Sequence, residues 1–230
     1  PKVALFSCNC HLFHKYASLL FHTERILFMK IFIMRHGETD FNQAHRLQGQ
    51  KDIPLNENGR DQARLAAEEF RQRGILFNRV ISSPLFRARE TAKIVSRQED
   101  MEIFNSLTEI DFGRYEGIKY EDIDENMRNF FHDPQKFIPM RKMESYTHLF
   151  ERISHFLDWL KQLEGEGNLL ILSHGAAIHA MMNQIYQLKL YDFWKQPIGN
   201  CGYFVVEIQD GQFRVVEENF RDGKNNYLKK

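Results

Sequence analysis

Two short apolar segments of the chain each end in a histidine that is followed by glycine. The first, KIFIM, runs into Arg35-His36-Gly37, and the second, LLILS, runs into His174-Gly175. A third apolar segment, RVIS, is followed a few residues later by Arg87. Two histidines and two arginines suit a tetrahedral dianion, and phosphate is the natural candidate because the planar arginine fork matches its oxygens.

These side chains can act together only if the segments before them are neighbouring strands. Residues 30–34, 79–82 and 169–173 are short runs rich in β-branched, aromatic or leucine residues, which favours buried strands, and a weaker strand is expected at 102–104. Ligands of parallel α/β sheets bind beyond the carboxyl ends of the strands, so both histidines should project into one crevice. Taken singly, each residue is more often an ordinary core or surface residue. Because they are all expected at one edge of one predicted sheet, a common anion-binding site is favoured.

Amphipathic helical patterns separate the predicted strands. Asn56 can cap a helix that Gly74 ends, and Ser83-Pro84 supplies an N-cap and a first-turn proline for a second helix. Further helices are expected near residues 121–131, 149–163 and 176–188, and Asp210-Gly211 predicts a hairpin turn. The inward-facing positions of the first two helices are Ala63, Ala66, Ala67 and Phe70, and Leu85, Ala88, Ala92 and Val95. The pattern predicts a three-layer α/β/α sandwich whose mainly parallel sheet carries an antiparallel edge hairpin.

The composition is that of an ordinary globular protein of one domain. Lys and Arg balance Asp and Glu at 31 each over 230 residues, so a nucleic-acid partner, which usually leaves a basic footprint, is not expected. Three cysteines provide no disulfide framework, which favours a reducing compartment, and we expect a cytoplasmic protein. No apolar run is long enough to span a bilayer, so no membrane integration is expected.

Residues 1–28 precede the recognisable pattern as an N-terminal extension of unknown role. The first methionine, Met29, stands immediately before the first predicted strand and is a candidate start of the native chain. The cysteines and histidines in Cys8-x-Cys10-His11-x-x-His14 are a weak zinc candidate, because this spacing matches no closed ligand set. The favoured interpretation is an extension that binds no metal.

Seven ordered motifs carry a resemblance to a known family. They are RHGETDFN, RLQGQKDIPLNENGRDQA, SSPLFRARETA, LTEIDFGRYEG, MES, SHG and GNC. In order and spacing they resemble the histidine phosphatase superfamily, the phosphoglycerate mutase-like enzymes, from about Met29 to Cys201. The resemblance implies a phosphoglycerate mutase-like fold and a single histidine phosphatase domain over residues 29–230.

The resemblance also implies roles for individual residues. His36 matches the family nucleophile, which becomes phosphohistidine, and Glu109 matches the proton donor, with Asp111 as a rival in the same loop. No step calls for a metal or another cofactor, and the expected partner is a small phosphorylated substrate, with a homodimer as an open alternative to a monomer. The groups that match the phosphate clamp are Arg35, Arg87 and His174, and those that match the phosphate or substrate pocket are Asn42, Gln48, Gly49 and Gly175.

Three functions remain open at this point. Mutases follow the donor glutamate with an arginine and place a tyrosine two residues further on, whereas this chain has Ile110 and Phe112, and MES is similar to the GES segment of the smaller phosphatase branch. We therefore expect a phosphomonoester hydrolase, with phosphoglycerate mutase as the alternative and a non-catalytic phospho-ligand binding relative as the third. Five aromatic residues could accept an apolar or aromatic alcohol or belong to the core: Phe112, Tyr115, Tyr120, Phe130 and Phe131.

Overall fold

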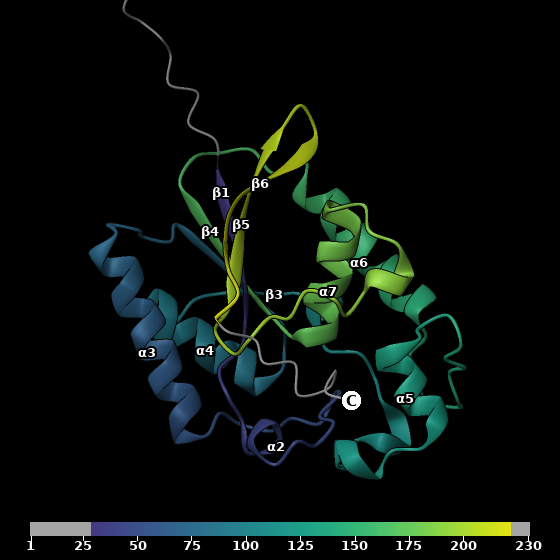
Figure 1. The fold of residues 1–230 in the computed structure, drawn as a ribbon. Helices are drawn as coiled ribbons and strands as arrows, with labels where there is room; N and C mark the ends of the chain where they lie inside the picture. Colours follow the sequence, from purple (N-terminus) through teal and green to yellow (C-terminus); the bar gives the residue numbers. More distant parts are fainter. Residues whose placement is uncertain (1–28, 222–230) are drawn as a thin grey trace, which may run out of the picture.

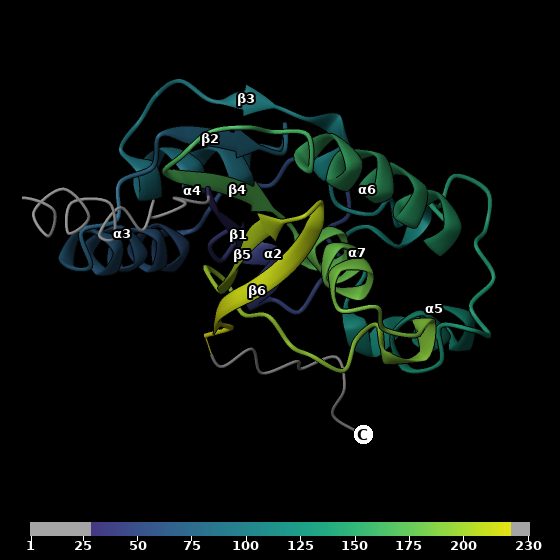
Figure 2. The ribbon, with the colours of Figure 1, turned by 90° about the horizontal axis from the view of Figure 1, so that it is seen from above.

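A computed structural model describes residues 29–221 and shows one six-stranded sheet flanked by helices. The strand order is β3-β2-β4-β1-β5-β6, and Figure 2 shows β3 and β6 at opposite edges. The pairs β1/β4, β2/β4 and β2/β3 are parallel, and β1/β5 and β5/β6 are antiparallel, which confirms the predicted sheet class. The strands are β1 (Lys30–Arg35), β2 (Arg79–Ser82), β3 (Glu102–Ile103), β4 (Asn168–Ser173), β5 (Tyr203–Gln209) and β6 (Gln212–Asn219).

Helices cover both faces of the sheet. Figure 1 shows α3 and α4 on one side and α6 and α7 on the other, while α2 and α5 lie beyond the end of the sheet. Alternate residues of β1 face the two layers: Ile31 and Ile33 pack in the α6/α7 core, and Phe32 and Met34 pack in the α3/α4 core. The helices are α2 (Asp40–Gln43), α3 (Glu57–Gln72), α4 (Phe86–Ser96), α5 (Glu125–His132), α6 (Tyr146–Leu160) and α7 (Gly175–Ile185).

The register of the central strands brings the chemistry-bearing segments to one edge. Arg35, the last residue of β1, pairs with Ser173, the last residue of β4, and Ser82 at the end of β2 pairs with Leu172. The segments that follow these three strands therefore start side by side, beyond the carboxyl ends of the parallel strands.

The helix after β2 begins later than the sequence predicts. Ser83-Pro84 was expected to cap and open it, but α4 begins at Phe86 and its N-cap is Leu85, which has extended backbone angles. The Ser83 hydroxyl instead lies 2.7 Å from Nε2 of His174 and accepts a hydrogen bond from the Leu85 N–H at 3.3 Å. Ser83 therefore belongs to a turn next to the site, and this turn delays the helix.

Other helix boundaries also differ from the expected ones. The helix expected near 121–131 begins only at Glu125, because Asp124 caps it by accepting a hydrogen bond from the Met127 N–H at 2.9 Å. The helix expected over 176–188 is α7, which starts at Gly175 and ends at Ile185. The cysteine and histidine segment at the N-terminus lies outside the described residues.

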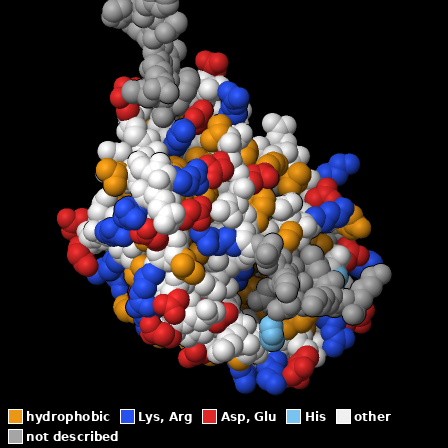
Figure 3. Space-filling model, turned by 60° about the vertical axis from the view of Figure 1, so that its left-hand side comes forward, with side chains coloured by type: hydrophobic (Ala, Val, Ile, Leu, Met, Phe, Trp, Pro, Cys, Tyr) orange, Lys and Arg blue, Asp and Glu red, His pale blue; other side chains and the backbone are white. Residues whose placement is uncertain are grey.

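The surface over α3 carries interspersed charges of both signs, as Figure 3 shows for the face that includes this helix. Several of these charges are paired along α3, including Arg64 with Asp61 and Arg71 with Glu68. Within residues 29–221, no helix is both long enough and apolar enough to cross a membrane.

Candidate active site

The predicted site residues surround one cavity at the carboxyl edge of the sheet. The cavity is lined by eight of the nine predicted residues, namely Arg35, His36, Asn42, Gln48, Gly49, Arg87, Glu109 and Gly175. His174, the ninth, lies directly behind it, with its ring centroid 5.1 Å from that of His36.

His36 is buried and held in a single tautomer. Its Nδ1 lies 2.6 Å from the carbonyl oxygen of Gly37, so Nδ1 carries the proton and Nε2 is unprotonated, with a lone pair that accepts from Arg87 Nε at 3.3 Å. Burial, followed by the charges of Arg87 and Arg35, holds the pKa of His36 well below its ordinary value. The imidazole is therefore neutral at physiological pH, and its Nε2 can act as a nucleophile.

The glycine after His36 permits a close backbone approach. A Cβ on Gly37 would lie 2.4 Å from the carbonyl oxygen of Gly59, near the start of α3. The Gly37 N–H donates to the hydroxyl of Thr91 on α4 at 3.1 Å. Contacts to α3 and α4 thus fix the loop that presents the Gly37 carbonyl to the His36 ring.

Arg87 is fully buried and reaches the site from the first turn of α4. Its Nη1 and Nη2 donate to the carbonyl oxygens of Lys51 and Gly49, both at 2.8 Å. Its Nε lies 3.3 Å from Nε2 of His36 and 3.2 Å from Nδ1 of His174. Burial lowers the pKa of Arg87 to about 10, which still leaves it charged at neutral pH. The guanidinium is thus fixed in place with its Nε donor facing both histidines.

Arg35 supplies a second cationic group with an unsatisfied donor. Its Nη1 donates to the carbonyl oxygen of Ile198 at 2.7 Å. Its Nε is buried and has no hydrogen-bond partner among the described residues. An unsatisfied buried N–H is costly, and an anion oxygen in the cavity would satisfy it.

His174 is fully buried, and burial and the charge of Arg87 hold its pKa well below the ordinary value. Because Nδ1 accepts from Arg87, the proton lies on Nε2 and is donated to the Ser83 hydroxyl. Sequence reasoning assigned Ser83 only to the helix cap. The strand-end rule that identified both histidines would also have found it, since it directly follows β2.

Glu109 reaches the cavity from the loop after β3 and contacts the N-terminus of α7. Its Oε1 accepts hydrogen bonds from the N–H groups of Ile110 and Ala176, both at 3.0 Å, and from Ala177 at 3.3 Å. The rival carboxylate, Asp111, lines a different cavity and accepts from the Gly113 N–H at 2.7 Å. Of the two carboxylates, the structure brings only Glu109 to the histidines.

The predicted pocket residues Asn42, Gln48 and Gly49 form the wall beside α2. Asn42 and Thr39 cap α2 reciprocally, and Asn200 of the GNC motif donates to the carbonyl oxygen of His36 at 3.0 Å. Gly49 has φ +56°, and a Cβ there would lie 2.0 Å from Oε1 of Glu116. This conformation turns the Gly49 carbonyl towards Arg87.

Several cavity residues were not singled out as site residues from the sequence. Arg46 contributes a third arginine, whose Nη1 donates to the carbonyl oxygen of Gly117 at 2.6 Å. Phe112, Tyr115, Phe130 and Phe131 are all buried in the core, and Phe112 and Phe131 also line the cavity. The remaining lining residues missed from the sequence are Leu47, Ala176, His179 and Trp194.

Comparisons with known proteins agree with this geometry. The sequence model described as histidine phosphatase superfamily (branch 1) matches residues 31–221. An uncharacterised phosphatase, PhoE, of Bacillus subtilis is 34% identical over 86% of this chain and 97% of its own length. A probable phosphoglycerate mutase, GpmB, of Serratia proteamaculans is 32% identical over 79% of this chain and 86% of its own. A phosphoserine phosphatase mutant of Entamoeba histolytica, solved with phosphoserine, superposes with a TM-score of 0.72 at 25% identity, covering 87% of this chain and 99% of its own.

Proposed function

The chain belongs to the histidine phosphatase superfamily, and from this premise we propose that it hydrolyses small phosphomonoesters through a phosphohistidine on His36. One observation carries the proposal: the unprotonated Nε2 of a buried, neutral His36 faces a cavity lined by three arginines and one carboxyl group. That combination supplies a nucleophile, charge stabilisation and a proton donor in one place.

In the first step Nε2 of His36 attacks phosphorus in line with the leaving oxygen. The N–P bond forms as the P–O bond to the alcohol breaks. Nδ1 keeps its proton throughout and donates it in a hydrogen bond to the Gly37 carbonyl oxygen. The Nε donors of Arg35 and Arg87 bind the non-bridging oxygens, because the first has no other partner among the described residues and the second already faces Nε2. Both arginines then stabilise the transferring phosphoryl group electrostatically.

Glu109 acts on the leaving group. Its carboxyl group is anchored through Oε1 at the start of α7, and the residue lines the same cavity as His36. Protonated Glu109 gives its proton to the departing alkoxide, which would otherwise be a poor leaving group. In the second step the resulting carboxylate takes a proton from water as the water oxygen attacks phosphorus, the N–P bond breaks and phosphate leaves.

Four large apolar residues, Leu47, Phe112, Phe131 and Trp194, are part of the cavity lining. They favour an alcohol with an apolar or aromatic portion. Ile110 is fully buried, so the position that carries an arginine in the mutases does not offer a cation to a substrate carboxylate. We propose a metabolite phosphate of this class as the substrate, processed without a metal in the cytoplasm.

Phosphoglycerate mutase is the alternative function, and two observations favour it. A relative of 32% identity carries that name, and Arg46 adds a third cation to the cavity that could hold a carboxylate. Conversion of 3-phosphoglycerate to 2-phosphoglycerate faster than its hydrolysis would establish this alternative in place of the phosphatase.

The test of the proposal is phosphate release from para-nitrophenyl phosphate and from a panel of alkyl, aryl, sugar and amino-acid phosphates. We expect turnover in the parent that chelator leaves unchanged and that His36→Ala reduces to background. A non-catalytic ligand-binding protein would instead bind phosphate without turnover. Unchanged turnover in His36→Ala would refute the mechanism, and loss of turnover with chelator would refute metal independence.

A further inference from the structure

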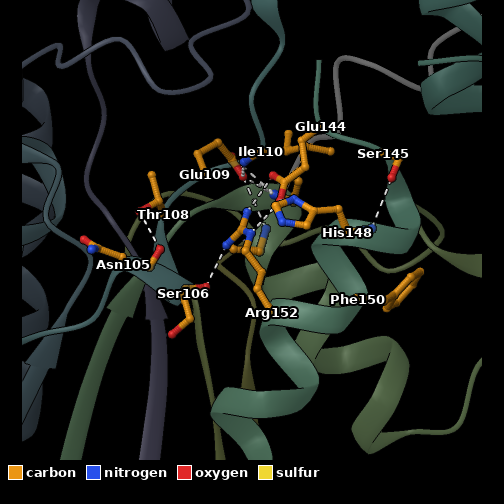
Figure 4. Close-up of polar contacts among 12 residues, drawn as sticks. Asn105, Ser106, Thr108, Glu109, Ile110, Glu144, Ser145, His148, Phe150 and Arg152 are labelled. Atoms are coloured by element: carbon orange, nitrogen blue, oxygen red, sulfur yellow. Dashed lines mark hydrogen bonds and ion pairs between the residues drawn. The ribbon is translucent and has the colours of Figure 1, made fainter. Parts of the chain in front are cut away.

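A buried ion pair lies directly beside the loop that carries Glu109. Figure 4 shows Arg152 rising from α6 towards Glu144, which lies just before that helix. The guanidinium binds the carboxylate in two places, with Nε to Oε1 at 2.7 Å and Nη2 to Oε2 at 2.9 Å. The side chains are only 15% and 5% exposed, respectively, so the pair is largely removed from water.

The two residues of the pair form hydrogen bonds to the Glu109 loop on both sides of the glutamate. Arg152 Nη1 donates to the carbonyl oxygen of Ser106, three residues before Glu109, at 2.6 Å. The backbone N–H of Glu144 donates to the carbonyl oxygen of Asp111, two residues after Glu109, at 2.9 Å. The loop between these two contacts carries the carboxyl group of Glu109 into the cavity. The guanidinium of the ion pair makes the first contact, and the backbone of its glutamate makes the second.

Stability alone explains this ion pair poorly. Two charges lose their hydration on burial, and replacing such a pair by apolar residues is often neutral or stabilising. Accurate placement of a reacting group, by contrast, is worth much to catalysis, since a shift of about 1 Å can cost about 10²-fold in rate. The two anchor points at Ser106 and Asp111 place the pair where it would control the position of Glu109.

We propose that the Glu144–Arg152 pair is a positioning element that holds Glu109 for proton transfer to the leaving group. This inference rests on the proposed function. Neither residue lines the cavity that contains His36, so each would act through Glu109 rather than on the substrate. Loss of the pair should therefore slow only those reactions that need the proton.

The test compares two substrates in Arg152→Lys, which keeps the charge but loses the planar fork. We expect kcat/KM to fall by about 10- to 10²-fold for phenethyl phosphate, whose alkoxide needs protonation, and by less than about threefold for para-nitrophenyl phosphate. Arg79→Lys is the matched control, because Arg79 makes a similar two-point pair with Glu102 at the β2/β3 edge, and we expect it to change neither value. Equal losses on both substrates, or no loss on either, would overturn the inference.

A double variant separates positioning from a general structural effect. If Arg152 acts through Glu109, Glu109→Gln/Arg152→Lys should lose no more activity on phenethyl phosphate than Glu109→Gln alone. Additive losses would overturn the inference. Should Arg152→Lys not fold, Glu144→Gln/Arg152→Met removes both charges together and is assayed in the same way. A parent that hydrolyses neither substrate would refute the proposed function, whereas an active parent with equal losses in the variants would refute only the positioning role.

Discussion

Replacing Arg87 by lysine perturbs the centre of the site without removing its charge. The fully buried guanidinium fixes two loop carbonyls, those of Gly49 and Lys51, and directs Nε at both histidines. Lysine offers a single ammonium on a flexible stem in place of this planar fork. The ammonium can replace only part of these contacts, so at least one carbonyl loses its partner and the donor facing His36 is displaced.

The expected magnitudes follow from these lost contacts. Loss of one preorganised donor to the transferring group costs about 10²- to 10³-fold in turnover. One buried carbonyl left without a partner costs about 1–3 kcal/mol in the free energy of unfolding. For a chain of this size that corresponds to a fall in Tm of about 2–12 °C.

The assay measures kcat/KM for para-nitrophenyl phosphate and Tm in parallel, with Arg89→Lys as the matched control. Arg89 lies two residues further along the same helix, and its exposed guanidinium stacks on Phe86. We expect Arg89→Lys to behave like the parent. A kcat/KM of Arg87→Lys within about threefold of that control would show that catalysis does not need the fixed guanidinium, since a lost donor should cost at least about 10²-fold.

Three further predictions follow from the site. Glu109→Gln should lose much more kcat/KM on alkyl phosphates than on para-nitrophenyl phosphate, because an acidic leaving group needs less protonation; a uniform loss would argue against its role as proton donor. Gly49→Ala should lower both Tm and activity more than Gly74→Ala, because both glycines have positive φ but only the first would force a Cβ into a neighbouring side chain; equal effects would contradict this. The unfolding free energy should decrease as pH falls below about 6.5, by up to about 1.4 kcal/mol per pH unit for each buried neutral histidine, because the unfolded chain binds the protons first. Urea titrations between pH 7.5 and pH 5 measure this slope, and a flat profile would contradict depressed pKa values at His36, His174 and His179, of which the last is lowered to about 4.

The sequence predicts the fold class and the strand ends because both depend on local patterns. Apolar runs followed by Arg35-His36 and by His174 place these residues at one edge as soon as the strands are parallel and adjacent. The predicted start of α4 was wrong by two residues, because Ser83 forms a hydrogen bond with His174, a residue 91 positions away. A capping pattern involves only neighbouring residues, so it cannot predict such a distant hydrogen-bond partner.

The long-range contacts of the loops could not be predicted from the sequence either. Nothing near Glu109 indicates that its carboxylate meets the N-terminus of α7, 67 residues further on, or that Asp111 turns to another cavity. The contact of Arg152 with the Ser106 carbonyl is of the same kind, since a backbone oxygen has no residue-specific signature. The motifs predicted which residues belong to the site, and the packing of loops determines how they are held.

In the proposed mechanism the phosphoryl group passes through Nε2 of His36. Its most direct test is a rapid quench of the protein during turnover of a radiolabelled phosphomonoester, followed by mapping of the protein-bound label. We expect a stoichiometric, acid-labile and base-stable phosphate on the peptide that contains His36, and no label in His36→Asn. Label on another residue, or full turnover by His36→Asn, would contradict it.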